Sequence, residues 1–154
     1  MDYTSDTFGL RVKAGSAAEI AGIEKQKINE ALFNGHMACL PETKPGSARL
    51  FTPFDLVALS VYSDYMKAGL SPAVAGIIAC RVLELLKQDY HNETATLKTV
   101  VVYPGSPLRF SCNPEFTAFK PTDLEGLVQE GDNFTAFGFA VNVTHYLIRI
   151  VYEL

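Results

Sequence analysis

The sequence predicts an α+β fold: a helical head over residues 1–90 and a small β-rich region over residues 91–154 that ends in a short helix. Two pairs of capped, amphipathic helical patterns predict the head. A Pro/Gly turn at residues 41–47, flanked by short apolar segments, predicts a β-hairpin between those pairs. β-branched segments after residue 96 predict the strands of the second region. A chain of 154 residues with 48% hydrophobic side chains can build one such domain with an appendage.

Composition excludes several classes of protein. The sequence has no window of about 18 apolar residues, so we expect no membrane span. Its first residues lack a cationic and then apolar pattern, so we expect no signal peptide. Cys39, Cys80 and Cys112 are odd in number and lack CxxC spacing. We therefore expect small buried thiols rather than a disulfide framework or a zinc site, and a cytoplasmic location.

Charge is distributed unevenly along the chain. The net charge of −4 argues against a strongly basic nucleic-acid binder. Residues 11–49 carry six cations and four acids, however, whereas residues 91–154 carry four cations and seven acids. A mildly basic head on an acidic remainder is compatible with a head that faces DNA.

The first helical pair lies on either side of Gly22. Ser16 and Glu19 have the spacing of a capping box, which predicts a short helix over residues 17–21. Gly22 should end this helix, and Ile23 should begin a second one that ends at Asn34-Gly35 in the left-handed conformation. The inward side of the second helix should carry Ile28 and Leu32, with Phe33 as a third candidate.

The outward side of this second helix carries the candidate readers of DNA. They are Lys25, Gln26, Lys27 and Asn29. Asn and Gln can bind adenine edges through two hydrogen bonds, and Lys can reach phosphate or guanine. The alternative interpretation is an ordinary solvated helix face.

A β-hairpin should follow the second helix. Residues 37–40 are apolar enough for a short strand, residues 41–47 form the turn, and residues 48–52 can return as the second strand. Such a hairpin is a wing. Lys44 and Ser47 near its tip and Arg49 on its return arm are placed to hold phosphates.

Two further helices should support the head. Thr52 is an N-cap with Pro53 at the first helical position, and this helix should run to about Ala68. Ser71 and Pro72 should start the next helix in the same way. That helix is apolar on more than one face through Leu86. It therefore needs two partners: the head on one side, and another element or a second subunit on the other.

This order of elements is a winged helix-turn-helix with a helical buttress, and it resembles the MerR-like family over about 70 residues. The motifs that carry the resemblance are, in order, Glu19-Ile20-Ala21, Gly22-Ile23, Gly35, Gly46, Arg49, Phe51, Asp55-Leu56 and Gly69-Leu70-Ser71. The resemblance implies a bacterial or phage transcription regulator. It also implies binding to double-stranded DNA through the second helix and the wing, usually as a homodimer.

The second region should be mainly extended. Strands are expected over residues 97–103, 108–112, 116–119 and 134–143, with a short turn of helix over residues 123–129 that Thr122 or Asp123 could cap. Residues 144–154 fit either a strand or a helix. We favour the helix because Leu147, Ile150, Val151 and Leu154 have complete i, i+3, i+4, i+7 spacing.

The sequence shows no catalytic constellation. His36, His91 and His145 have no partner at nucleophile or metal spacing, so we expect no enzyme, metal or cofactor. The aromatic side chains of the second region are expected in the core, with a pocket for a small apolar effector as the alternative.

Two functions are compatible with these observations. The first is a sequence-specific DNA-binding regulator. The second is a non-catalytic protein-interaction or adaptor module on the same scaffold. Asn29, Glu30 and Ala31 stand where the family often has Arg-Tyr-Tyr, and the long dimerising helix of many members is missing after Leu86. Both departures, with the acidic net charge, motivate the second function.

Overall fold

The fold comes from a computed structural model, which describes residues 9–91, 100–104, 116–119 and 139–154. In chain order the elements are β1 (Val12–Lys13), α2 (Ala14–Ala21), α3 (Lys25–Phe33), β2 (Leu50–Phe51), α4 (Pro53–Lys67), α5 (Pro72–His91), β3 (Val100–Pro104), β4 (Phe116–Phe119), β5 (Phe139–Val141) and α7 (Val143–Glu153).

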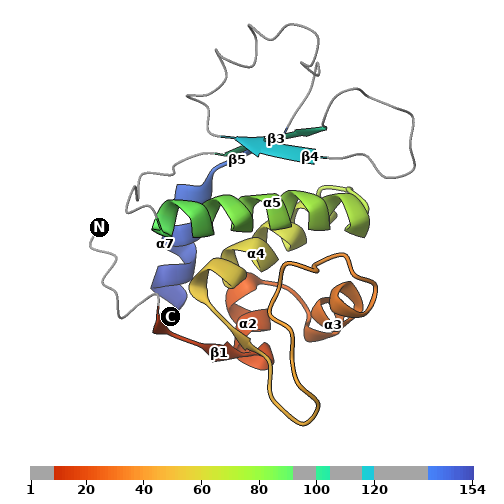
Figure 1. Cartoon of the computed structure of the whole chain (residues 1–154), viewed down its shortest axis with the longest axis vertical. Coiled ribbons are helices and arrows are strands. Elements are labelled where there is room, and N and C mark those ends of the chain that lie inside the picture. Colours follow the sequence, from red (N-terminus) through yellow and green to blue (C-terminus); the bar gives the residue numbers. More distant parts are fainter. Residues whose placement is uncertain (1–8, 92–99, 105–115, 120–138) are drawn as a thin grey trace, which may run out of the picture.

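Helix α4 lies at the centre of the described structure. Every residue from Leu56 to Ser63 is buried, so α4 is covered on all sides rather than along one stripe. It packs against α5, α7, α2 and β2 (Figure 1). The largest fully buried side chains from outside α4 include Phe51, Ile28, Met37, Ile78 and Ile150. The core therefore joins the helical head to the C-terminal helix α7.

Helices α2 and α3 confirm the predicted pair with a tight break, although α3 begins at Lys25 and not at the predicted Ile23. They are joined by a three-residue turn, Gly22–Glu24, in which Gly22 has φ 69°. The predicted cap at Ser16 is wrong, because α2 already begins at Ala14, with Lys13 as its N-cap. Strand β1, which pairs with β2, ends at residue 13. Helix α2 follows it directly and therefore begins three residues before the predicted start at residue 17.

The predicted hairpin wing is wrong. Residues 37–40 form turns instead of a strand, and the side chains of Met37 and Leu40 are buried in the core. Strand β2 pairs with β1, in the register Val12↔Phe51 and Lys13↔Leu50. What remains between α3 and β2 is a loop over residues 41–49, with a turn at its tip closed by Ser47 N–H donating to the Lys44 carbonyl at 3.1 Å.

Helices α4 and α5 confirm the predicted buttress. At the start of α4, Thr52 accepts from the Asp55 N–H at 3.1 Å and donates its own N–H to the Asp55 carboxylate at 2.8 Å. Ser71 Oγ accepts from the Val74 N–H at the start of α5. The two partners that α5 needs are α4 on one side and the sheet formed by β4, β3 and β5 on the other (Figure 1). Within the described part of the chain, no helix is both long and apolar enough to cross a membrane.

The predicted fold class, α+β with a β-rich C-terminal region, is wrong. Over the described residues the protein is mostly helical, with five helices, and its strands have only two to five residues each. Strands do form at 100–104, 116–119 and 139–141, and the helix at the C-terminus is confirmed as α7. The strand expected at 108–112 and the helix expected at 123–129 lie outside the described residues.

The cysteine prediction is also wrong. Cys39 and Cys80 form a disulfide across 41 residues of sequence, with their Cα atoms 5.5 Å apart. Cys112 lies outside the described residues. The turns after α3 place Cys39 beside the middle of α5. The fold therefore brings together two cysteines whose distance in sequence did not indicate a disulfide.

The capping box of α4 gives a stability prediction. Thr52→Ala should lower the free energy of unfolding by about 1 kcal/mol, because one N–H at the start of α4 loses its acceptor. Ser16→Ala is the matched control. Residue 16 has cap-like spacing but lies inside α2, so this change should cost nothing. Urea denaturation followed by circular dichroism measures both, and equal losses would contradict the assignment of the cap.

Candidate nucleic-acid interface

Helix α3 presents most of its surface to solvent. Of its nine residues only Ile28 and Ala31 are buried and Leu32 is half-buried. The four predicted readers, Lys25, Gln26, Lys27 and Asn29, are all exposed. The exposure of these four side chains was therefore predicted correctly, and the outer face of α3 is open to a large partner.

Glu30 organises this outer face. Its carboxylate accepts from Gln26 Nε2 at 3.1 Å and pairs with Lys27 Nζ at 3.3 Å. Two of the predicted readers are therefore held by an acid in the free protein. Both pairs are on the surface, where such contacts are weak, so a phosphate or a base edge can replace them.

Phe33 is placed differently from its prediction. Instead of facing inward, its side chain is 92% exposed. It follows Gln26, Asn29 and Glu30 at i, i+3, i+4 and i+7, so the four side chains form one stripe along α3. Ile28, Leu32 and Phe33 cannot all share one inward face of a helix that turns 100° per residue, so Phe33 lies on the other side.

The loop over residues 41–49 carries the other three predicted site residues. Lys44 and Ser47 are exposed at its tip, and the loop projects from the same end of the molecule as α2 and α3 (Figure 1). Arg49 is half-buried and donates from Nη2 to Thr43 Oγ1 at 3.4 Å. Its Nε is buried and has no hydrogen-bond partner among the described residues. Arg49 is therefore partly a structural residue of the loop.

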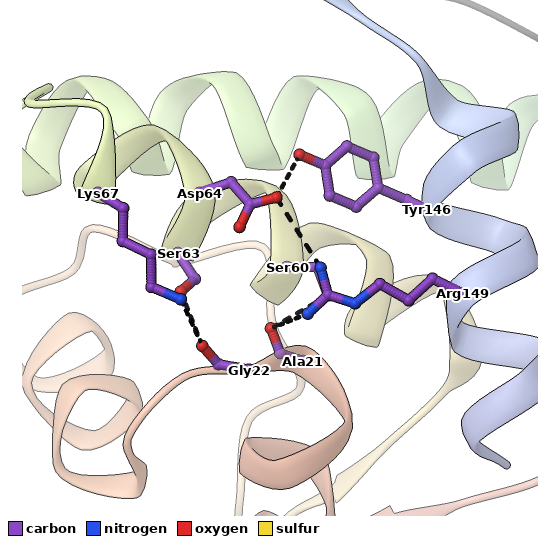
Figure 2. A network of polar contacts seen from close by, with 8 residues as sticks. All are labelled: Ala21, Gly22, Ser60, Ser63, Asp64, Lys67, Tyr146 and Arg149. Atoms are coloured by element: carbon purple, nitrogen blue, oxygen red, sulfur yellow. Dashed lines mark hydrogen bonds and ion pairs between the residues drawn. The ribbon is translucent and has the colours of Figure 1, made fainter.

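The turn between α2 and α3 is held by side chains from two other helices. The carbonyl of Ala21 accepts from Ser60 Oγ at 3.4 Å and from Arg149 Nη2 at 3.3 Å. The carbonyl of Gly22 accepts from Ser63 Oγ at 3.1 Å and from Lys67 Nζ at 3.0 Å. These are end carbonyls of α2, which lack partners in their own helix. We call these six residues, drawn in Figure 2, the Gly22 clamp.

Asp64 connects the Gly22 clamp to α7. Its carboxylate accepts from the Tyr146 hydroxyl at 2.8 Å and lies 3.9 Å from Arg149 Nη1 (Figure 2). Burial, and then this hydrogen bond, raise the pKa of the Tyr146 hydroxyl well above its ordinary value. Arg149 therefore links α7 directly to the turn of the helix pair, and the Asp64 carboxylate of α4 contacts both Arg149 and Tyr146.

No residue of this clamp is among the predicted site residues. A signal existed, since Ser60 and Ser63 interrupt an otherwise apolar helix at i, i+3, and Arg149 interrupts the apolar seam of α7. Their shared target is a pair of backbone carbonyls, which no side-chain pattern can reveal.

A cleft opens beside the same turn. It has a volume of about 590 Å³ and lies between the start of α3, the end of α4 and the start of α5. Its lining is Gly22, Ile23, Glu24, Lys27, Ser63, Met66, Lys67, Leu70 and Pro72. Lys27 thus belongs both to the cleft and to the outer face of α3.

Comparison with protein-family models and with curated proteins finds no match for this chain.

The tight turn gives a second stability prediction. Gly22→Ala should lower the free energy of unfolding by about 1–2 kcal/mol, because φ 69° is costly for a residue with a Cβ. The new Cβ would also lie 2.7 Å from Arg149 Nη2. Gly15→Ala is the control: it lies within α2, and its Cβ would meet no described atom within 4 Å. Thermal or urea unfolding should show a loss for the first variant only.

The raised pKa of Tyr146 predicts a pH dependence. A raised pKa means that the folded protein keeps the proton when the unfolded chain loses it. The stabilisation is therefore complete below about pH 10, the ordinary pKa of tyrosine, and declines at higher pH. Tyr146→Phe should lower stability at pH 7 by about 1 kcal/mol, and its deficit should shrink above pH 10.

Urea unfolding of both proteins between pH 7 and pH 11 measures that deficit. Tyr152→Phe, on the same helix but with a side chain that is 82% exposed, controls for the loss of a hydroxyl. A Tyr146→Phe deficit that stays constant up to pH 11 would contradict the prediction.

Proposed function

We propose that this chain is a sequence-specific transcription regulator that binds double-stranded DNA through α3 and the loop over residues 41–49. One observation carries the proposal: two helices joined by a three-residue turn with a left-handed glycine, the second of which exposes Lys, Gln and Asn. Helix pairs of this kind place the second helix in the major groove.

The type of regulator proposed is MerR-like, on the order of motifs that runs from Glu19 to Ser71. In this proposal the protein is cytoplasmic, has no catalytic activity, and needs no metal or cofactor. It binds DNA as a homodimer, so its half-sites should lie about one helical turn apart.

Each site residue has a role in this proposal. Gln26 and Asn29 bind adenine edges, while Lys25 and Lys27 reach phosphate or guanine. Lys44 and Ser47 hold the DNA backbone from the loop, and Arg49 supports the loop and adds charge beside it. The cleft lined by Lys27 and Lys67 is the place where a small effector could act on α3.

A protein-interaction or adaptor module is the second candidate. Glu30 at the centre of the outer face and the exposed ring of Phe33 favour it, because a carboxylate repels phosphate and aromatic side chains are enriched in protein interfaces. On this alternative the same face of α3 would bind a protein.

The deciding experiment is a selection on random double-stranded DNA, followed by titration of the winner at several salt concentrations. A regulator should enrich a two-fold symmetric site and lose affinity as salt rises. Lys27→Ala should reduce the salt slope by about one unit, and Lys87→Ala on α5 should leave the slope unchanged. No enrichment with folded protein would overturn the regulator and favour the adaptor.

Glu30 gives a sharper prediction about the same face. Glu30→Gln should raise DNA affinity by about three- to tenfold, because it removes a repelling charge and releases Lys27. Glu84→Gln is the matched control. Glu84 forms the same i, i+3 pair with Arg81 at 2.8 Å, but on α5. Fluorescence anisotropy with the selected site measures both variants, and an equal gain in both would show a general charge effect.

A further inference from the structure

The Cys39–Cys80 disulfide lies where it can control α3. Helix α3 ends at Phe33, and the turns that follow it carry Cys39 to the middle of α5. Both cysteines are only partly buried, and Ala38 beside Cys39 is exposed. A small thiol or disulfide can therefore reach the pair from solvent.

The turns after α3 are firmly connected to α3. The Ala31 carbonyl accepts from the N–H groups of both His36 and Met37, at 2.9 and 3.4 Å. The side chains of Met37 and Leu40 are buried in the core. A displacement of the turns would therefore also displace the end of α3.

The same turns lie directly against α5. Gly76 is buried one helical turn before Cys80, and a Cβ at this position would overlap with the backbone carbonyl of His36. The disulfide thus joins two backbones that already touch, and it fixes the end of α3 to α5.

Helix α3 depends on its two ends for its position. It has nine residues, six of them exposed, and an isolated helix of this length is marginal in water. The Gly22 clamp holds its beginning. The contact between the turns and α5 holds its end, and the disulfide is the covalent part of that contact.

We propose that Cys39 and Cys80 are a redox-active thiol pair that orders the end of α3 when oxidised. For its effect on DNA the inference rests on the proposed function, since oxidised protein should bind DNA more tightly than reduced protein. The oxidant belongs to the class of low-molecular-weight disulfides, such as glutathione disulfide.

The chemistry proceeds by two thiol–disulfide exchanges. The thiolate of one cysteine attacks the small disulfide, which forms a mixed disulfide and releases one small thiolate. The second cysteine's thiolate then attacks the protein sulfur of the mixed disulfide and releases the other small thiolate. Overall, two protein thiols lose two electrons and two protons, and one small disulfide is reduced to two thiols.

The test uses the full chain carrying Cys112→Ser, so that only the pair can exchange. The protein is equilibrated in glutathione buffers of increasing reducing strength. Alkylation and mass spectrometry measure the fraction of oxidised pair, and hydrogen exchange measures protection of residues 28–40. DNA affinity is measured on the selected site in both states. The double variant Cys39→Ser/Cys80→Ser, which can form neither the disulfide nor a mixed disulfide, should match the reduced protein in every buffer.

We expect the pair to titrate within the glutathione series, and amide exchange over residues 28–40 to be at least about fivefold faster in the reduced protein. DNA affinity should fall by a similar factor. A pair that resists reduction in folded protein, or equal exchange in both states, would overturn the inference. If exchange changes but neither state binds DNA, the redox pair stands and the proposed function is overturned.

Discussion

The structure of the head depends on how two backbone carbonyls are satisfied. The last carbonyls of α2 have no partner in their own helix, and Ala21 is fully buried, so leaving its carbonyl unpaired would cost free energy. Ser60, Ser63 and Lys67 from α4 and Arg149 from α7 supply donors to them. The turn between α2 and α3 is thereby fixed relative to the central helix, and α3 leaves it in a defined direction.

This arrangement explains why a short helix can expose so much of its surface. Most helices are stabilised by a wide apolar stripe against a core. Helix α3 has only Ile28 and Ala31 fully buried, so its position depends on its ends. The Gly22 clamp secures one end, and the turns against α5 secure the other. The outer face of α3 consequently contributes little to the core.

The C-terminal helix α7 also contacts the helical head. Arg149 and Tyr146 lie far from the first helices in sequence, yet they reach the Ala21 carbonyl and Asp64. Strand β5 ends at Val141 and α7 begins at Val143, so α7 connects the sheet to the clamp.

The sequence by itself determined the features that depend on neighbouring residues, namely helix starts, turns and helical periodicity. Thr52-Pro53 and Ser71-Pro72 mark the starts of α4 and α5, Gly22 and Gly35 supply turns, and the seam of α7 has a helical period. It also identified the polar side chains that α3 exposes, but not the exposure of Phe33 beside them. Tertiary structure decided the rest: the partner of β2, the burial of residues 37–40 in turns, the Cys39–Cys80 bond, the clamp, and a mostly helical fold. Each of these depends on groups far apart in sequence meeting in space, and a pattern read along the chain holds no information about such distances.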